Sequence, residues 1–163
     1  MAELGVYSAD ATEGVMRMED LPEAQVVRRS RNYKRRTCPE CGCSAYRLRT
    51  CCRRLHDLGD PASARPRDLC VAYSQHRCPE CNTYFNADMD DLALPKCHYT
   101  HRVVNTAVRL VVEDGLPYRA ASWHLWRDHR VFVPFATIQN WIEAGGKKRR
   151  AAGRRRVPRR RSV

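Results

Sequence analysis

The spacing of apolar residues changes character near residue 95. After that point they return at the interval of one helical face, as in Val103, Ala107, Leu110 and Val111. Gly115 stops this helix, and Pro117 suits the first turn of the next. The pattern predicts three helices, over 99–114, 116–128 and 135–144.

Before residue 95, apolar and polar residues alternate over shorter stretches, as in β-strands. The alternation predicts strands over 45–58 and 68–77 and a short third strand over 83–85, with a bulge at the pair Cys51-Cys52. Residues 59–66 are rich in Gly, Pro, Asp and Ser, so they are expected to form a loop.

Two copies of one tetrapeptide flank the two longer strands. Cys38-Pro39-Glu40-Cys41 returns as Cys78-Pro79-Glu80-Cys81. Two pairs at C-x-x-C spacing supply the four thiolates of a structural Zn²⁺ site, whereas a thioredoxin-like redox motif needs one pair on a βαβ unit. The sequence therefore predicts one structural zinc ion, and no catalytic zinc because no ligand position is left for water.

Other cysteines and histidines leave questions open. Cys43 lies beside the first motif and competes as a ligand, and the tract Cys97, His98 and His101 is a weaker candidate for a second metal site.

The net charge of +12 is concentrated in flanking segments. Residues 1–25 hold six acids and one base, residues 26–37 six bases and no acid, and residues 145–163 ten bases and no acid. Charge blocks of this density do not fold alone and commonly bind polyanions. The segment 26–37 has two interpretations, a solvated linker or a phosphate-contacting arm in which Tyr33 stacks on a base or sugar.

The predicted architecture is small α+β: a zinc ribbon of short antiparallel strands, then an all-α trihelical helix-turn-helix, with a disordered basic tail. The expected parts are a disordered acidic-then-basic arm over 1–37, the ribbon over 38–94, the helix-turn-helix over 95–146 and an Arg-rich tail over 147–163. No run of apolar residues is long enough to span a membrane, and the N-terminus lacks the order of a signal peptide. We expect a reducing compartment, the cytoplasm, with association to the nucleoid.

In a helix-turn-helix the last helix enters the major groove of DNA. Its outward residues here are Phe135, Ala136, Gln139 and Asn140, and amides pair with adenine. The expected phosphate contacts are Lys147, Lys148, Arg149 and Arg150. An ordinary helical bundle with solvent-facing amides is the alternative.

One stretch adds a resemblance. Asp114-Gly115-Leu116-Pro117-Tyr118-Arg119, followed by Leu125 and by Thr137-Ile138-Gln139-Asn140-Trp141-Ile142, resembles the helix-turn-helix of bacterial insertion-sequence transposases of the DDE type. The preceding ribbon is similar to the one at the N-terminus of such transposases, so the resemblance covers about residues 38–146. It implies DNA recognition, transposition and DNA recombination. Their catalytic domain, with three carboxylates on two Mg²⁺ ions, is not expected here because only 19 residues follow Ala144.

The leading hypothesis is a DNA-binding protein that is not an enzyme, whose partner is double-stranded DNA. A homodimer or a larger nucleic-acid complex is compatible with it. An RNA-binding protein and an adaptor subunit of a nucleic-acid-processing complex are the alternatives. A preference for duplex over single strands discriminates between DNA and RNA binding.

Overall fold

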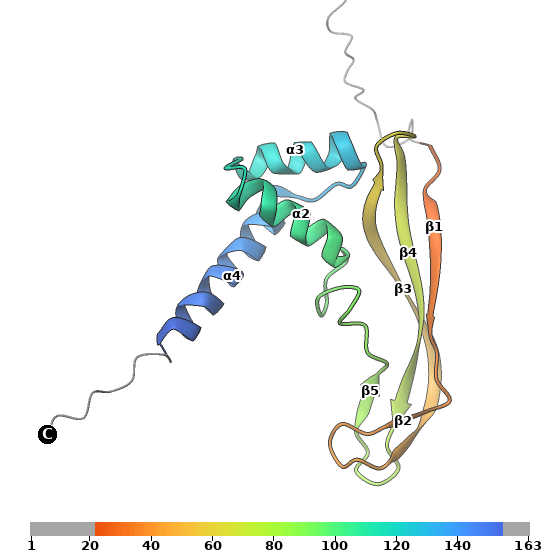
Figure 1. The fold of residues 1–163 in the computed structure, drawn as a ribbon. Coiled ribbons are helices and arrows are strands. Elements are labelled where there is room, and N and C mark those ends of the chain that lie inside the picture. Colours follow the sequence, from red (N-terminus) through yellow and green to blue (C-terminus); the bar gives the residue numbers. More distant parts are fainter. Residues whose placement is uncertain (1–21, 155–163) are drawn as a thin grey trace, which may run out of the picture.

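A computed structural model describes residues 22–154 of the chain, with side chains up to residue 148. A mixed five-stranded sheet comes first along the chain, and three helices follow it (Figure 1). The strands are β1 (Gln25–Arg31), β2 (Arg35–Thr37), β3 (Ser44–Asp60), β4 (Arg65–Arg77) and β5 (Tyr84–Asn86). The helices are α2 (His101–Val112), α3 (Tyr118–His129) and α4 (Phe135–Arg154).

The sheet is built on the long hairpin of β3 and β4. Its strand order is β1-β4-β3-β2, with β5 also paired to β4. Strand β1 runs parallel to β4, and the other pairs are antiparallel. The hairpin turns at Asp60, whose carboxylate accepts hydrogen bonds from the main chain of Ala62 and Ser63. Register shifts interrupt the β3–β4 ladder between Arg47 and Arg49 and near Asp60, whereas the bulge expected at Cys51-Cys52 does not form.

A short crossing of the chain places β1 and β2 at opposite edges of the sheet. Between them, Tyr33 lies over β4, where its N–H donates to Ser74 Oγ at 3.0 Å and its carbonyl lies 3.2 Å from His76 Nε2. The crossing buries Ser74 and His76 completely. Because buried polar groups need hydrogen-bond partners, the contacts of Ser74 Oγ and His76 Nε2 favour the observed register, whereas His76 Nδ1 has no partner among the described residues.

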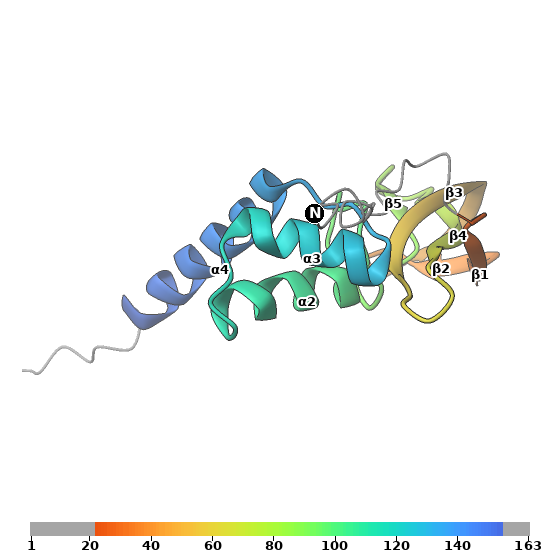
Figure 2. The same cartoon turned by 90° about the horizontal axis from the view of Figure 1, so that it is seen from above.

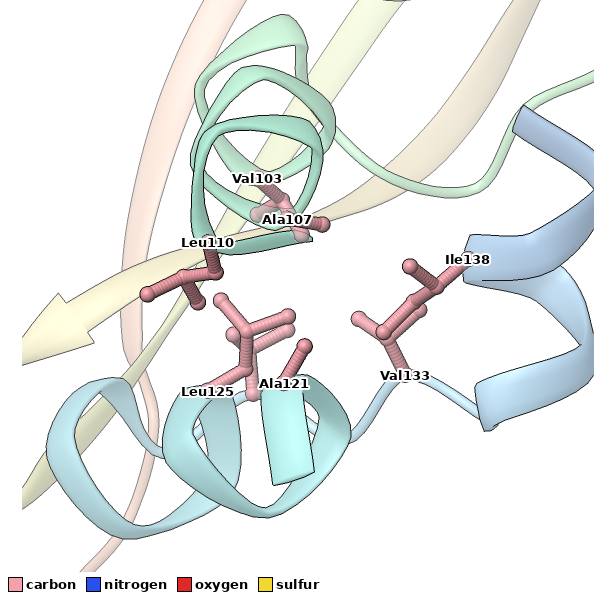
Figure 3. Packing of buried hydrophobic residues seen from close by; sticks show 8 residues of the cluster. Val103, Ala107, Leu110, Ala121, Leu125, Val133 and Ile138 are labelled. Carbon is pink, nitrogen blue, oxygen red and sulfur yellow. The ribbon is translucent and has the colours of Figure 1, made fainter. Parts of the chain in front are cut away.

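The three helices share one apolar core (Figure 3). Its fully buried members include Val103, Ala107, Leu125, Val133 and Ile138. Burying an aliphatic side chain of this size contributes about 1.5–3 kcal/mol. The apolar residues that recur at helical spacing after residue 95 of the sequence, such as Val103, Ala107 and Leu110, belong to this core.

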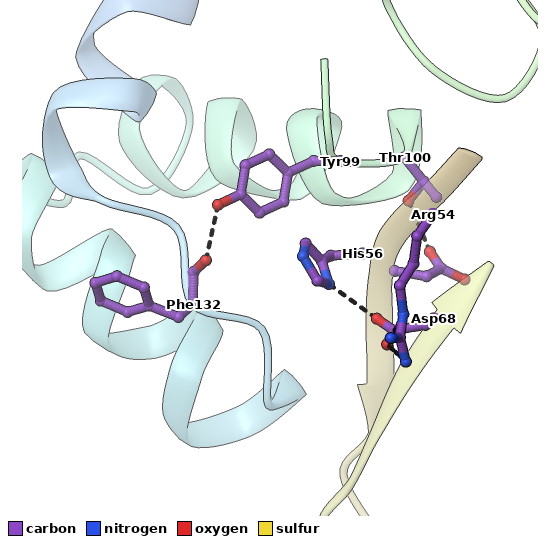
Figure 4. A network of polar contacts seen from close by, with 7 residues as sticks. Arg54, His56, Asp68, Tyr99, Thr100 and Phe132 are labelled. Atoms are coloured by element: carbon purple, nitrogen blue, oxygen red, sulfur yellow. Dashed lines mark hydrogen bonds and ion pairs between the residues drawn. The ribbon is translucent and has the colours of Figure 1, made fainter. Parts of the chain in front are cut away.

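The helices lie to one side of the sheet (Figure 2), beside one of its ends (Figure 1), and are joined to it. Leu58 of β3 packs against the helical core. Buried Asp57 accepts hydrogen bonds from Thr100 Oγ1 at 2.7 Å and Arg102 Nη1 at 2.9 Å, which ties β3 to the start of α2. The main chain of His56 pairs with residues 98 and 100. Figure 4 shows this junction, with His56 and Arg54 on the carboxylate of Asp68.

The predicted fold class is wrong. In the described part of the chain there is no separate all-α trihelical helix-turn-helix domain, because the helices follow a mixed sheet and pack on β3. The sheet is also not a ribbon of short strands, since β3 has 17 residues and β4 has 13. The helices α2 and α3 nevertheless lie close to the predicted positions.

The segments expected to be disordered are partly regular. Residues 26–37, expected as an arm, form most of β1 and all of β2. Helix α4 does not end at Gly145-Gly146 but continues to Arg154. Glycine lowers helix propensity by roughly 1 kcal/mol without forbidding a helix. The rest of the predicted acidic arm and Arg-rich tail, residues 1–21 and 155–163, lies outside the described residues.

No helix in residues 22–154 combines the length and the apolar character needed to cross a membrane.

Candidate metal centre and its surface

The two Cys-Pro-Glu-Cys segments fold into matching knuckles at the end of the sheet away from the helices (Figure 1). In each, the first cysteine accepts a main-chain hydrogen bond of 3.0 Å, from Gly42 in one knuckle and from Asn82 in the other. Both of these residues have positive φ, 75° and 58°, a conformation open to Gly and tolerated by Asn. The repeated sequence thus produces a repeated backbone geometry.

The strands bring the two knuckles together. The Sγ atoms of Cys38, Cys41, Cys78 and Cys81 all lie within 4.8 Å of one another. Cys38 Sγ is 3.6 Å from Cys81 Sγ, and Cys41 Sγ is 3.5 Å from Cys78 Sγ. Sulfurs bound at about 2.3 Å to one tetrahedral ion lie roughly 3.8 Å apart, so the cluster fits such an ion. The four cysteines could therefore hold a metal ion.

One ligand has a local partner that favours its thiolate. The Thr83 hydroxyl lies 3.1 Å from Cys81 Sγ, and hydrogen bonding from Thr83 lowers the pKa of the Cys81 thiol to about 6. Metals bind thiolates rather than thiols, so this contact favours ligation by Cys81, whereas the neighbouring thiols raise the pKa of Cys41 above its ordinary value.

The other cysteine and histidine candidates do not join the cluster. Cys43 Sγ lies 3.9 Å from the carbonyl of Cys41. His101 Nε2 lies 2.6 Å from the carbonyl of Asp90, and Arg53 donates to the carbonyl of Cys97. Within residues 22–154, the four knuckle cysteines form the one group arranged for a metal, so the tract Cys97, His98 and His101 does not make a second one.

Exposed arginines and tyrosines surround the knuckles. The guanidinium of Arg35 lies 5.0 Å from the centre of the Tyr46 ring, that of Arg36 is 4.6 Å from Tyr33, and that of Arg77 is 5.7 Å from Tyr84. These three cation–π pairs hold the guanidinium groups at the surface without neutralising their charge.

Among the described residues, five arginines pair with carboxylates, and none of the five lies beside the knuckles. These arginines belong to three strands and two helices, and are Arg31 of β1, Arg54 of β3, Arg67 of β4, Arg102 of α2 and Arg127 of α3. Among the side chains that the structure describes, none of the metal-end cations forms such a pair; these are Lys34, Arg35, Arg36, Arg47, Arg49 and Arg77. Three of them donate instead to neutral amides, Arg47 to Asn32, Arg49 to Gln75 and Arg77 to Asn82, at 2.7–2.9 Å.

The residues predicted to contact DNA lie elsewhere, on α4. Phe135, Ala136 and Asn140 are exposed, whereas Gln139 is half-buried and donates to Glu143 at 2.9 Å. Arg119 lies over the ring of Phe135, so two of the four predicted base-reading residues already have intramolecular partners. Lys147 and Lys148 are exposed on the continued helix, and Arg149 and Arg150 follow on α4 without described side chains.

Sequence reasoning missed the surface formed by Arg35, Arg47, Arg77, Tyr46 and Tyr84. The residues are spread over four strands, and only the pairing register brings them together. The available signal was composition, since these strands are rich in Arg and Tyr.

Comparison with protein-family models, with curated proteins and with solved structures finds no match to this chain.

Proposed function

We propose that this protein binds nucleic acid through the metal-held end of its sheet, and that the metal is one structural Zn²⁺ ion. The role is one of binding, and no catalytic step is assigned. The proposal does not depend on the resemblance to transposases, for which the comparisons return no relative.

The donor set favours zinc. Four thiolates in a tetrahedral arrangement are the ligands of structural zinc sites, which leave no position for a water molecule. Zinc binding contributes on the order of 10–16 kcal/mol in zinc-finger peptides. Here it would secure β2 and β5, which have three residues each and flank the knuckles.

The observation that carries the proposal is the gathering of six cations around the knuckles, none of them paired with a carboxylate among the described side chains. Their positive charges exceed the negative charges beside them, which are one each on Glu40 and Glu80 and a formal 2− on Zn²⁺ with four thiolates. A cationic side chain that is already paired with a carboxylate must lose that partner before it contacts phosphate, whereas these six need not. The amide hydrogen bonds of Arg47, Arg49 and Arg77 orient the charges in advance, which lowers the entropy cost of binding.

Helix α4 is a second candidate for phosphate contact, and its shape suits double-stranded DNA. Its second half projects from the helical core (Figure 1) and carries exposed Lys147 and Lys148. A projecting basic helix can follow the phosphates of a duplex, and we propose phosphate contact as its role.

The test is the salt dependence of binding to labelled DNA of mixed sequence, single-stranded and duplex, measured by fluorescence anisotropy on the zinc-loaded full chain. Removing one phosphate contact lowers the slope of log K against log salt by roughly 0.7–0.9. We expect a decrease of about this size for Arg35→Gln, Arg47→Gln and Arg77→Gln, and their approximate sum, about 2–3, for the triple variant.

Arg127→Gln is the matched control. Arg127 is also exposed, but it lies on α3 and is paired with Asp128 at 3.0 Å. Its slope should equal that of the wild type. Absence of binding at low salt, or equal slopes for the triple variant and the wild type, would show that this surface does not bind nucleic acid.

A further inference from the structure

Four side chains form a row across the metal end of the sheet. Arg35 of β2 is registered with Tyr46 of β3, Tyr46 with Arg77 of β4, and Arg77 with Tyr84 of β5. Directly opposed residues of antiparallel strands point to the same face. The row therefore alternates Arg-Tyr-Arg-Tyr on one face, over four adjacent strands.

Solvent reaches every member of this row. Tyr46 is 53% exposed and Tyr84 is 57% exposed, and both arginines are exposed as well. Large aromatic side chains normally bury their rings, and these two are covered only in part by the neighbouring guanidinium groups. Aromatic area is thus left for a ligand, with a positive charge beside each ring.

The surface next to Tyr46 is hollowed. A depression of about 390 Å³ is lined by two members of the row, by the next two residues of β3 and by residues of the second knuckle: Tyr46, Arg77, Arg47, Leu48, Pro79 and Asn82. It combines an aromatic ring and an apolar side chain with two guanidinium groups. A flat aromatic group attached to an anion matches this lining.

Spacing decides which form of nucleic acid fits. Adjacent strands lie about 4.8 Å apart, so the backbones that carry Tyr46 and Tyr84 are separated by roughly 10 Å. Bases in a duplex are stacked at about 3.4 Å and offer no free face to two such rings. Bases of an unpaired strand can be splayed and can stack separately on aromatic side chains.

We propose that the row Arg35, Tyr46, Arg77 and Tyr84 is a binding site for an unpaired nucleic-acid strand, with bases stacked on the two tyrosines and phosphates beside the two arginines. This inference rests on the proposed nucleic-acid binding and specifies the ligand of that surface. A tyrosine platform contributes stacking, which does not depend on salt, whereas the arginines contribute the salt-dependent part.

The experiment compares three DNA ligands of equal length: a single strand, the same strand with abasic sites at its centre, and the fully paired duplex. Each is titrated by anisotropy against wild-type protein, the double variant Tyr46→Leu with Tyr84→Leu, and the double variant Tyr46→Phe with Tyr84→Phe. Trp123→Leu is the control, because Trp123 is similarly exposed, at 51%, but lies on α3. Zinc content is measured by native mass spectrometry for every variant.

Loss of one stacked base weakens binding by roughly ten-fold. The wild type should bind the single strand more tightly than the abasic strand and the duplex, by about ten-fold or more. The leucine variant should lose this preference, while the phenylalanine variant and Trp123→Leu should keep it.

If the leucine variant binds all three ligands as the wild type does, the row does not stack bases. In that case the arginine variants would still show reduced salt slopes if the surface binds phosphates, so this inference fails while the proposed function survives. Equal affinity of the wild type for the single strand and the abasic strand would overturn the inference in the same way.

Discussion

Gly59 is the position at which the packing of the helices against the sheet can be tested most directly. It lies near the end of β3, against the last residue of α3. A Cβ atom at this position would be 2.5 Å from the carbonyl oxygen of His129 and 2.6 Å from that of Arg65. Both atoms belong to the backbone, so Gly59→Ala can be accommodated only if the end of α3 and the start of β4 both shift away from residue 59.

The size of the effect follows from those two contacts. Adding a methyl group to a well-packed site costs about 1–3 kcal/mol. Because two backbone atoms obstruct the same methyl group and neither can rotate away, we expect the upper end, about 3 kcal/mol. With a urea dependence near 2 kcal/mol/M, this loss lowers the unfolding midpoint by roughly 1.5 M.

Two probes follow the two parts of the molecule during urea unfolding. All three tryptophans, Trp123, Trp126 and Trp141, lie in α3 and α4, so their fluorescence reports on the helices. Replacing zinc by Co²⁺ gives thiolate absorption bands that report on the metal end. Gly146→Ala is the control, because nothing lies within 4 Å of an added Cβ and alanine favours the helix by about 1 kcal/mol.

We expect the tryptophan midpoint to fall in Gly59→Ala and to stay equal or rise in Gly146→Ala. An unchanged tryptophan midpoint in Gly59→Ala would refute the reasoning, because it would mean that the helices are stable without their contact to the sheet.

Two further predictions concern the metal and pH. Removal of zinc by a chelator, or Cys81→Ser, should speed amide hydrogen exchange in β2 and β5 to nearly the unprotected rate, because these short strands depend on the knuckles. Cys52→Ser, which changes an exposed cysteine outside the cluster, should leave the exchange rates as they are. Unchanged protection without metal would contradict a structural role. Burial lowers the pKa of His129 below its ordinary value of 6.5, so the folded state resists protonation of this side chain. The unfolded state takes up the proton first, so the free energy of unfolding is undiminished above about pH 6.5 and falls as pH drops below that value. The free energy of unfolding from urea titrations at pH 7.5 and pH 5 should therefore fall less in His129→Gln than in the wild type, and an equal fall in both would argue against this assignment.

The metal cluster is the feature that the sequence predicted best. The two ligands of each segment, Cys38–Cys41 and Cys78–Cys81, are three residues apart, so one turn of the chain brings them together and the sequence alone shows it. The pairing of the two knuckles followed from counting four ligands. The long interval between them, which departs from the ribbon expected at the outset, is the β3–β4 hairpin.

The arms and the helix ends were predicted less well, because the local signals there were opposed by tertiary contacts. A block of arginines with Val26 and Val27 indicates disorder by composition. Strand β1 forms because β4 supplies its hydrogen bonds and because Val27 packs beside Leu69 and Leu55. Likewise, Gly145 and Gly146 signal a helix end, but the helix continues through both positions.

The sequence by itself determined the elements whose physics is local: the two knuckles, the apolar stripes of α2 and α3, and the blocks of positive charge. Tertiary structure alone decided how these elements meet, because strand pairing and helix docking join residues far apart in the chain. The register that aligns Arg35, Tyr46, Arg77 and Tyr84 arises from three separate strand pairings. Asp57 and Leu58 place the helices on the sheet rather than in a domain of their own. Neither arrangement leaves a periodic signal in the chain, because periodicity records which face of an element is buried but not which partner covers it.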